Sequence, residues 1–142
     1  MYGRTGLDNK FIEMLDELIS KNKGVFDLGR LPRDKVIEEK LKAEYHLYFT
    51  NCDQEIDCIS IKESHLLGCI PIISNQGVFK ERTGAHYNFD VNNPEQTYTD
   101  FANNLITDIK NNNVKIDVIE DIQKWNKVAN IWQETIGFEF YY

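Results

Sequence analysis

Two glutamates, Glu55 and Glu63, lie eight positions apart and carry the side chains best suited to ligand binding in this sequence. They are followed by Gly68, Pro71 and an apolar run over residues 70–73. This order predicts a loop, a helix, a turn and a buried strand. We therefore expect both acids to face a cleft at the carboxyl edge of a sheet, where α/β proteins bind ligands. Taken alone, two glutamates are more typical of a solvated acidic surface.

The rest of the chain supplies the elements that would position this pair. Short apolar segments alternate with amphipathic ones, which predicts βα units and a parallel sheet. The predicted strands cover residues 25–28, 45–50, 70–73 and 87–89. The predicted helices cover about 9–21 and 34–42, a segment that includes Glu63, a short piece near Phe79, and segments beginning after Asn93 and near Asp117. The helix after Asn93 has an apolar stripe that we expect to be buried, formed by Tyr98, Phe101, Ala102, Leu105, Ile106 and Ile109.

The composition is that of one folded domain, since 142 residues with 42% hydrophobic and 27% charged side chains can build a core. The net charge of −7 argues against nucleic acid as the main partner. No apolar run reaches membrane-spanning length and the first residues lack a signal-peptide pattern, so we expect no transmembrane segment and a cytoplasmic location. The cysteines, Cys52, Cys58 and Cys69, lack metal-site spacing and are expected to be reduced thiols, without a bound metal.

Three motifs in register carry a resemblance to a known family. They are Glu55-x7-Glu63, Gly68-x-x-Pro71-Ile-Ile-Ser and Gly77-x3-Glu81. Together they resemble the C-terminal, donor-binding domain of the group 1 retaining GT-B glycosyltransferases. The resemblance implies an α/β, Rossmann-like parallel sheet with helices on both faces, a single half of a GT-B fold. It covers residues 1–142 and implies that the acceptor-binding domain and the first strand of this domain are missing.

The resemblance also implies roles for residues around the predicted motif helix. Glu55 would be the catalytic residue, lying near the donor sugar and bonding its hydroxyls. Glu63 would accept hydrogen bonds from the ribose hydroxyls, for which a carboxylate offers paired acceptor positions. Ile59 and Ser60 would start the helix, whose N–H groups and dipole favour the pyrophosphate.

Four further residues are implied as donor contacts. Leu31 falls where the family packs against the nucleobase. Gly77 and Val78 correspond to a loop whose backbone approaches the sugar and phosphate. Glu81 either contacts the donor or caps a turn, and the sequence leaves these two interpretations open.

The chain departs from the family pattern at three points. Cys58 stands where the family commonly has glycine, which adds strain if that backbone needs a positive φ. Asp57 places a negative charge near the expected pyrophosphate, which is unfavourable unless it points away or caps the helix. The family's upstream arginine and lysine have no clear counterpart, because Arg4 and Lys10 only superficially match their spacing.

We therefore expect a donor-binding domain that uses a nucleotide-diphosphate sugar as its substrate, needs no cofactor or metal, and transfers little sugar alone. Whether the chain is an enzyme stays open at this point. The alternative is a non-catalytic, truncated or split family member that acts as a binding or interaction module. Its partner would be a separate acceptor-binding domain or a second copy, through an exposed face near the aromatic residues 138–142. A third interpretation, an unrelated flavodoxin-like domain, is disfavoured because the first βα turn lacks a phosphate fingerprint.

Overall fold

The computed structural model describes residues 8–51, 54–119, 127, 130, 131 and 134. The chain divides into two compact units, Met1–Glu39 and Lys40–Tyr142, and each is described by itself. Several predictions fall outside the described residues. They concern the superficial match of Arg4 to the family's arginine, most of a helix beginning near residue 117, and the aromatic tail over residues 138–142.

The first unit contains helix α1 (Asn9–Lys21) and most of helix α2 (Arg33–Lys42). Asp8 caps α1, because its Oδ1 accepts the Lys10 N–H at 3.0 Å. Both helices agree with the sequence pattern to within one residue.

The predicted strand over residues 25–28 is wrong. These described residues form no strand, and Phe26 is 76% exposed. A strand needs a neighbour to satisfy its backbone groups, and no described residue pairs with this segment. The segment instead ends in a turn in which Asp27 accepts the Gly29 N–H at 2.8 Å.

In the second unit the described residues form a three-stranded parallel sheet in the order β1-β2-β3. Its strands are β1 (Tyr45–Tyr48), β2 (Ile70–Ser74) and β3 (Ala85–Tyr87). The sequence therefore predicted the α/β class and the parallel pairing correctly. It placed β3 about two residues too late and extended β1 two residues too far.

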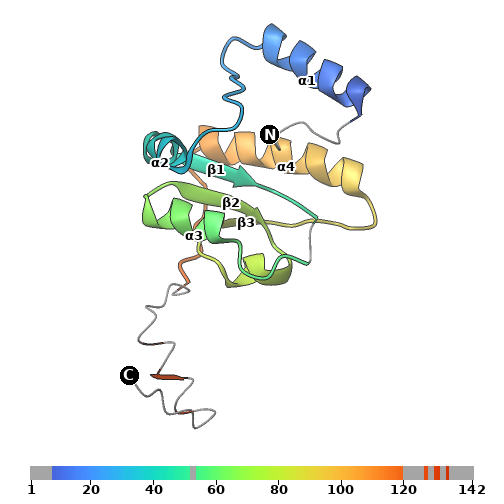
Figure 1. Cartoon of the computed structure of the whole chain (residues 1–142). Helices are drawn as coiled ribbons and strands as arrows, with labels where there is room; N and C mark the ends of the chain where they lie inside the picture. The colour runs from blue at the N-terminus through green and yellow to red at the C-terminus, as the bar shows by residue number, and fades with distance from the viewer. Residues whose placement is uncertain (1–7, 52–53, 120–126, 128–129, 132–133, 135–142) are drawn as a thin grey trace. The chain divides into compact units, whose positions relative to one another are not determined.

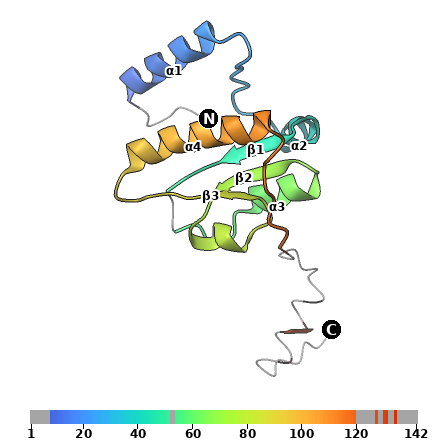
Figure 2. The same ribbon diagram turned by 180° about the vertical axis from the view of Figure 1, so that it is seen from behind.

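Helices cover both faces of this sheet, as Figures 1 and 2 show from opposite sides. Helix α3 (Ile59–Leu66) and the short 3₁₀ helix η1 (Gly77–Glu81) pack on one face through a core of Cys58, Ile61, Ile73 and Phe79. Helix α4 (Pro94–Lys110) packs on the other face through Ile72, Ala85 and Leu105. The neighbouring residues Ile72 and Ile73 serve different cores because successive strand side chains point to opposite faces. This is the Rossmann-like arrangement that the sequence predicts.

The buried stripe predicted for α4 is only partly correct. Leu105 is buried and Phe101 is half-buried, whereas Tyr98, Ile106 and Ile109 are at least 38% exposed. The strands beneath α4 are only three to five residues long, so they cover a narrow part of the helix.

Candidate ligand site at the start of helix α3

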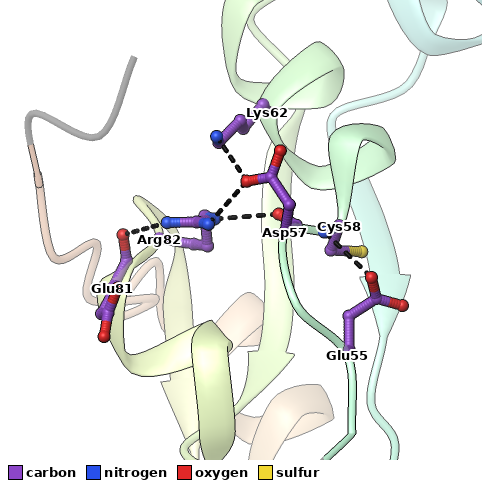
Figure 3. A network of polar contacts seen from close by, with 6 residues as sticks. All are labelled: Glu55, Asp57, Cys58, Lys62, Glu81 and Arg82. Atoms are coloured by element: carbon purple, nitrogen blue, oxygen red, sulfur yellow. Dashed lines mark hydrogen bonds and ion pairs between the residues drawn. The ribbon is translucent and has the colours of Figure 1, made fainter. Parts of the chain in front are cut away.

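Glu55 lies in the loop between β1 and α3 and contacts the start of that helix. Its Oε1 accepts the Cys58 N–H at 3.1 Å, and the side chain is half-buried. Glu55 thus satisfies one backbone N–H at a helix start, a role that carboxylates often have there. The contact places the predicted sugar-binding carboxylate directly beside the predicted pyrophosphate position (Figure 3).

Cys58, which stands where the family commonly has glycine, adopts a left-handed backbone conformation. Its φ is 47° and its ψ is 66° at the N-cap of α3. This conformation costs a residue with a Cβ about 1–2 kcal/mol relative to the right-handed one. The side chain is buried in the core beside Ile61, and burial raises the pKa of its thiol. The turn is therefore one in which glycine would be unstrained.

Asp57 does not face the helix start alone but pairs with two cations. Its Oδ1 lies 2.5 Å from Lys62 Nζ and 2.7 Å from the Arg82 Nη2, as Figure 3 shows. The hydrogen bond from Lys62, followed by the charges of Lys62 and Arg82, holds the pKa of Asp57 below its usual range. The unfavourable charge expected from the sequence is therefore neutralised by residues of the protein itself.

Lys40 joins Ser60 and Glu63 on α3. Its Nζ donates to the Ser60 carbonyl at 2.8 Å and to the Ser60 Oγ at 2.9 Å, and it lies 3.6 Å from the Glu63 Oε2. Lys40 is 9% exposed, so its charge is held away from water beside this carboxylate. Glu63 is partly exposed, at 26% of its side-chain area. The predicted ribose contact thus keeps access to solvent and lies near a buried cation.

A buried hydroxyl extends this network toward the sheet. Ser64 Oγ lies 3.0 Å from the Ser60 carbonyl oxygen and shares a hydrogen bond of 2.7 Å with the Nδ1 of His46. Burial, followed by the charge of Lys40, lowers the pKa of His46. The lowered pKa favours the neutral imidazole, and the contact with Ser64 links β1 to α3.

The predicted contacts from the η1 region lie across the same core. Gly77 begins η1 with a φ of 50°, and Val78 is half-buried against Phe79 and its cluster. Glu81 is exposed, and its carbonyl accepts the Arg82 Nη1 at 3.0 Å.

Leu31 is a predicted site residue that belongs to the first unit, whereas the other predicted site residues belong to the second. It lies between Gly29 and α2 in the first unit, where its side chain is half-buried. The site described here consists of residues of the second unit alone, so the nucleobase role of Leu31 stays a prediction.

Sequence reasoning missed the three cations of this site, which are Lys40, Lys62 and Arg82. Lys62 lies on the motif helix, five residues after Asp57, and its charge could have been noticed there. Arg82 is 25 residues from Asp57 and Lys40 is 20 residues from Ser60. No local pattern marks these two long-range contacts.

A cavity of about 470 Å³ lies between β3 and α4, and no residue of α3 lines it. Tyr87 there donates to Asp108 at 2.9 Å, and burial together with that carboxylate raises the pKa of Tyr87 to about 12. Among the described residues, no group of three or more His, Cys, Asp or Glu side chains has an arrangement that could hold a metal ion. None of the described helices has the length and apolar character needed to span a membrane.

No protein-family model matches this chain, and comparisons with curated proteins and with solved structures give no significant match. The resemblance to glycosyltransferases therefore rests on the motif residues of the sequence alone.

Proposed function

We propose that this chain binds a nucleotide-diphosphate sugar at the start of α3, as the donor-binding domain of a retaining glycosyltransferase. The observation that carries the proposal is the left-handed conformation of Cys58 at the N-cap of α3. The family motif commonly has glycine at this position, and glycine is the residue that adopts this conformation without strain. The positive φ of Cys58 is therefore the conformation that a glycine of the motif would favour, which supports the proposal.

The pyrophosphate would bind at the first turn of α3. The N–H groups of Ile59 and Ser60 have no acceptor within the helix, and the helix dipole favours negative charge there. Lys62 and Arg82 lie beside this turn. They supply positive charge of the kind that the family places upstream of this region.

The two glutamates would bind hydroxyl groups on either side of the pyrophosphate. Glu63 is partly exposed and would accept from the ribose diol. Glu55 contacts the Cys58 N–H and would bond the sugar, where a carboxylate also favours the positive charge that develops at the departing sugar carbon. Transfer to a hydroxyl with retention then requires that the leaving diphosphate be stabilised electrostatically.

A second candidate is a binding module that does not transfer sugar and pairs with a separate acceptor-binding chain or a second copy. It is favoured by the Asp57 carboxylate, which already neutralises part of the charge that would stabilise a leaving diphosphate. In both candidates we propose a cytoplasmic location, because the described cysteines, Cys58 and Cys69, are free thiols, as is usual in reducing compartments.

Calorimetric titration with UDP, GDP and their sugar conjugates tests the proposal. We expect binding at millimolar concentration or below, and no binding at millimolar ligand would overturn it. Because the chain alone is expected to transfer little sugar, an acceptor-binding domain is then added together with a hydroxyl acceptor. Release of nucleoside diphosphate in that mixture separates the two candidates, since only the first is expected to transfer sugar.

Glu63→Gln tests the ribose role. We expect the affinity for the nucleotide to fall about tenfold, because a charge-assisted hydrogen bond to the diol is weakened. Glu38→Gln is the matched control, since Glu38 also pairs with a lysine on a helix but lies in the first unit. Equal affinities of the two variants would reject the role of Glu63.

A further inference from the structure

His86, in the middle of β3, lies between two hydrogen-bond acceptors from different parts of the second unit. Its Nδ1 is 2.9 Å from the Asp117 Oδ2, and its Nε2 is 2.9 Å from the Phe79 carbonyl oxygen. The side chain of His86 is 9% exposed, whereas that of Asp117 is 69% exposed. The ring is therefore fixed inside the fold, while its carboxylate partner lies largely in solvent.

Both contacts can be hydrogen bonds only if the imidazole ring carries two protons. A backbone carbonyl and an ionised carboxylate accept hydrogen bonds and cannot donate them. A neutral imidazole has one N–H group, so it bonds one of the two oxygens and turns a lone pair toward the other. The imidazolium form donates from both nitrogens and satisfies both partners.

The segment that contains Asp117 is tied to the chain just before β3. Asp117 and Gly84 exchange two backbone hydrogen bonds, of 2.9 and 3.1 Å, in an isolated antiparallel bridge. Two residues further on, the backbone of Ile119 exchanges hydrogen bonds of 2.6 and 2.8 Å with the Thr83 hydroxyl. Residues 117–119 therefore follow the edge of the sheet at the start of β3.

The His86 ring adds a link between this segment and η1, because the Phe79 carbonyl belongs to η1. Among the described residues, Asp117 is the charged group at hydrogen-bond distance from the ring. Other titratable side chains share a cavity with His86 or follow Phe79 along the chain, and they are Tyr87, Asp90, Asp100, Asp108 and Lys115 in the cavities and Lys80, Glu81 and Arg82 after Phe79.

We propose that His86 is a pH-sensitive clamp that holds residues 117–119 against the start of β3. In the imidazolium form, the ring bonds Asp117 and the Phe79 carbonyl together. When His86 loses its second proton, one of the two bonds is lost and the segment opens more often. Histidine makes this change between about pH 5 and 8, so the clamp responds in the physiological range. The inference concerns the segment after α4 and does not depend on the proposed ligand.

Hydrogen exchange of the Gly84 and Asp117 amides tests the clamp in the full chain, because each amide donates to the carbonyl of the other residue across the bridge. NMR gives their protection factors, in which the intrinsic pH dependence of exchange is removed. We expect the protection of both amides to fall about threefold between about pH 5.5 and 8, as is usual for the loss of a partly exposed ion pair.

Asp117→Asn separates a clamp that needs the charged ring from a contact that is merely structural. An amide can accept at Oδ1 from a charged ring or donate from Nδ2 to a neutral one, so the link survives in both forms. We expect the bridge amides of this variant to keep their protection at the higher pH. His86→Gln should also remove the pH dependence, because glutamine does not titrate.

Asp100→Asn is the matched control, since it makes the same change of charge on an exposed aspartate of α4. Its bridge amides should show the same fall in protection as those of the unchanged protein. His46 is present in every variant, so its own effect on stability is common to all and cancels in the comparison. Thermal unfolding of each variant shows that the protection factors come from folded protein.

A fall in protection that is present in the unchanged protein and absent from Asp117→Asn and His86→Gln supports the clamp. A fall of the same size in Asp117→Asn would assign the effect to another titrating group and overturn the inference. Equal protection at the two pH values in the unchanged protein would also overturn it, and would mean that the bridge between Gly84 and Asp117 holds the segment without the ring.

Discussion

Residues at the start of α3 combine backbone strain with hydrogen bonds and ion pairs to their polar groups. Cys58 accepts a left-handed conformation, and Glu55 bonds its N–H while Asp57 pairs with the cations. Strain of this kind persists where surrounding contacts determine the backbone, and it is found often at ligand sites. The start of α3 is thus a turn whose backbone conformation is determined by specific side-chain contacts.

Replacing Cys58 measures that strain. Both Cys58→Gly and Cys58→Ala remove the buried thiol, but only glycine relieves the left-handed conformation. We expect Cys58→Gly to be more stable to urea than Cys58→Ala by about 1 kcal/mol. At an ordinary position alanine is the more stable of the two by about 0.5–1 kcal/mol in helices or strands. If Cys58→Ala were more stable than Cys58→Gly, residue 58 would not be left-handed in solution.

His46 makes the stability depend on pH. The pKa of His46 is lowered in the folded protein by burial and by Lys40, so the unfolded chain binds the proton more readily. The free energy of unfolding contributed by neutral His46 is then complete above the unfolded pKa and is lost as the pH falls below it. Urea unfolding between pH 7.5 and 5.5 should show this loss, and His46→Gln should make it smaller.

At the scale of elements, β3 depends on a close approach between Gly84 and β2. A Cβ at Gly84 would lie 2.7 Å from the Pro71 carbonyl oxygen and 3.2 Å from a carbon of Ile73. Gly84 also pairs with Asp117 in an isolated antiparallel bridge. The strand can therefore reach β2 at this point only because residue 84 has no side chain.

Gly84→Ala should lower the free energy of unfolding by about 1–3 kcal/mol, because the backbone of Pro71 must move to make room. Gly24→Ala is the control, since a Cβ there meets no atom within 4 Å. Urea denaturation of both variants provides the comparison. A loss no larger than that of the control would mean that β2 and β3 separate more easily than their packing indicates.

At the scale of the whole molecule, protection should concentrate in the second unit. Strand β2 lies between two other strands, and helices cover both its faces, so its amides should exchange most slowly. Residues 26–28 form no strand and should exchange faster by orders of magnitude. Hydrogen exchange followed by mass spectrometry or NMR measures both regions. Equal protection would show that residues 25–28 do pair as the sequence pattern predicts.

The sequence by itself determined the α/β class, the order of most elements, and the position of Glu55 and Glu63 around one helix. These features depend on local periodicity and on caps such as Asp8, which act over a few residues. The strand at residues 25–28 failed because pairing depends on a neighbour that local composition does not specify. The α4 stripe was partly wrong because the width of the sheet, not the helix, decides how much is buried.

Only the tertiary structure decided the conformation of Cys58 and the cations of the site. Asp57 and Arg82 meet across 25 residues because β2 carries the chain from α3 to η1, and Lys40 meets Ser60 across 20. Such contacts follow from how helices pack on the sheet, and charge in the linear sequence does not encode them. The two glutamates could be singled out from their spacing, whereas the lysine and arginine side chains of the site come together only when the chain folds.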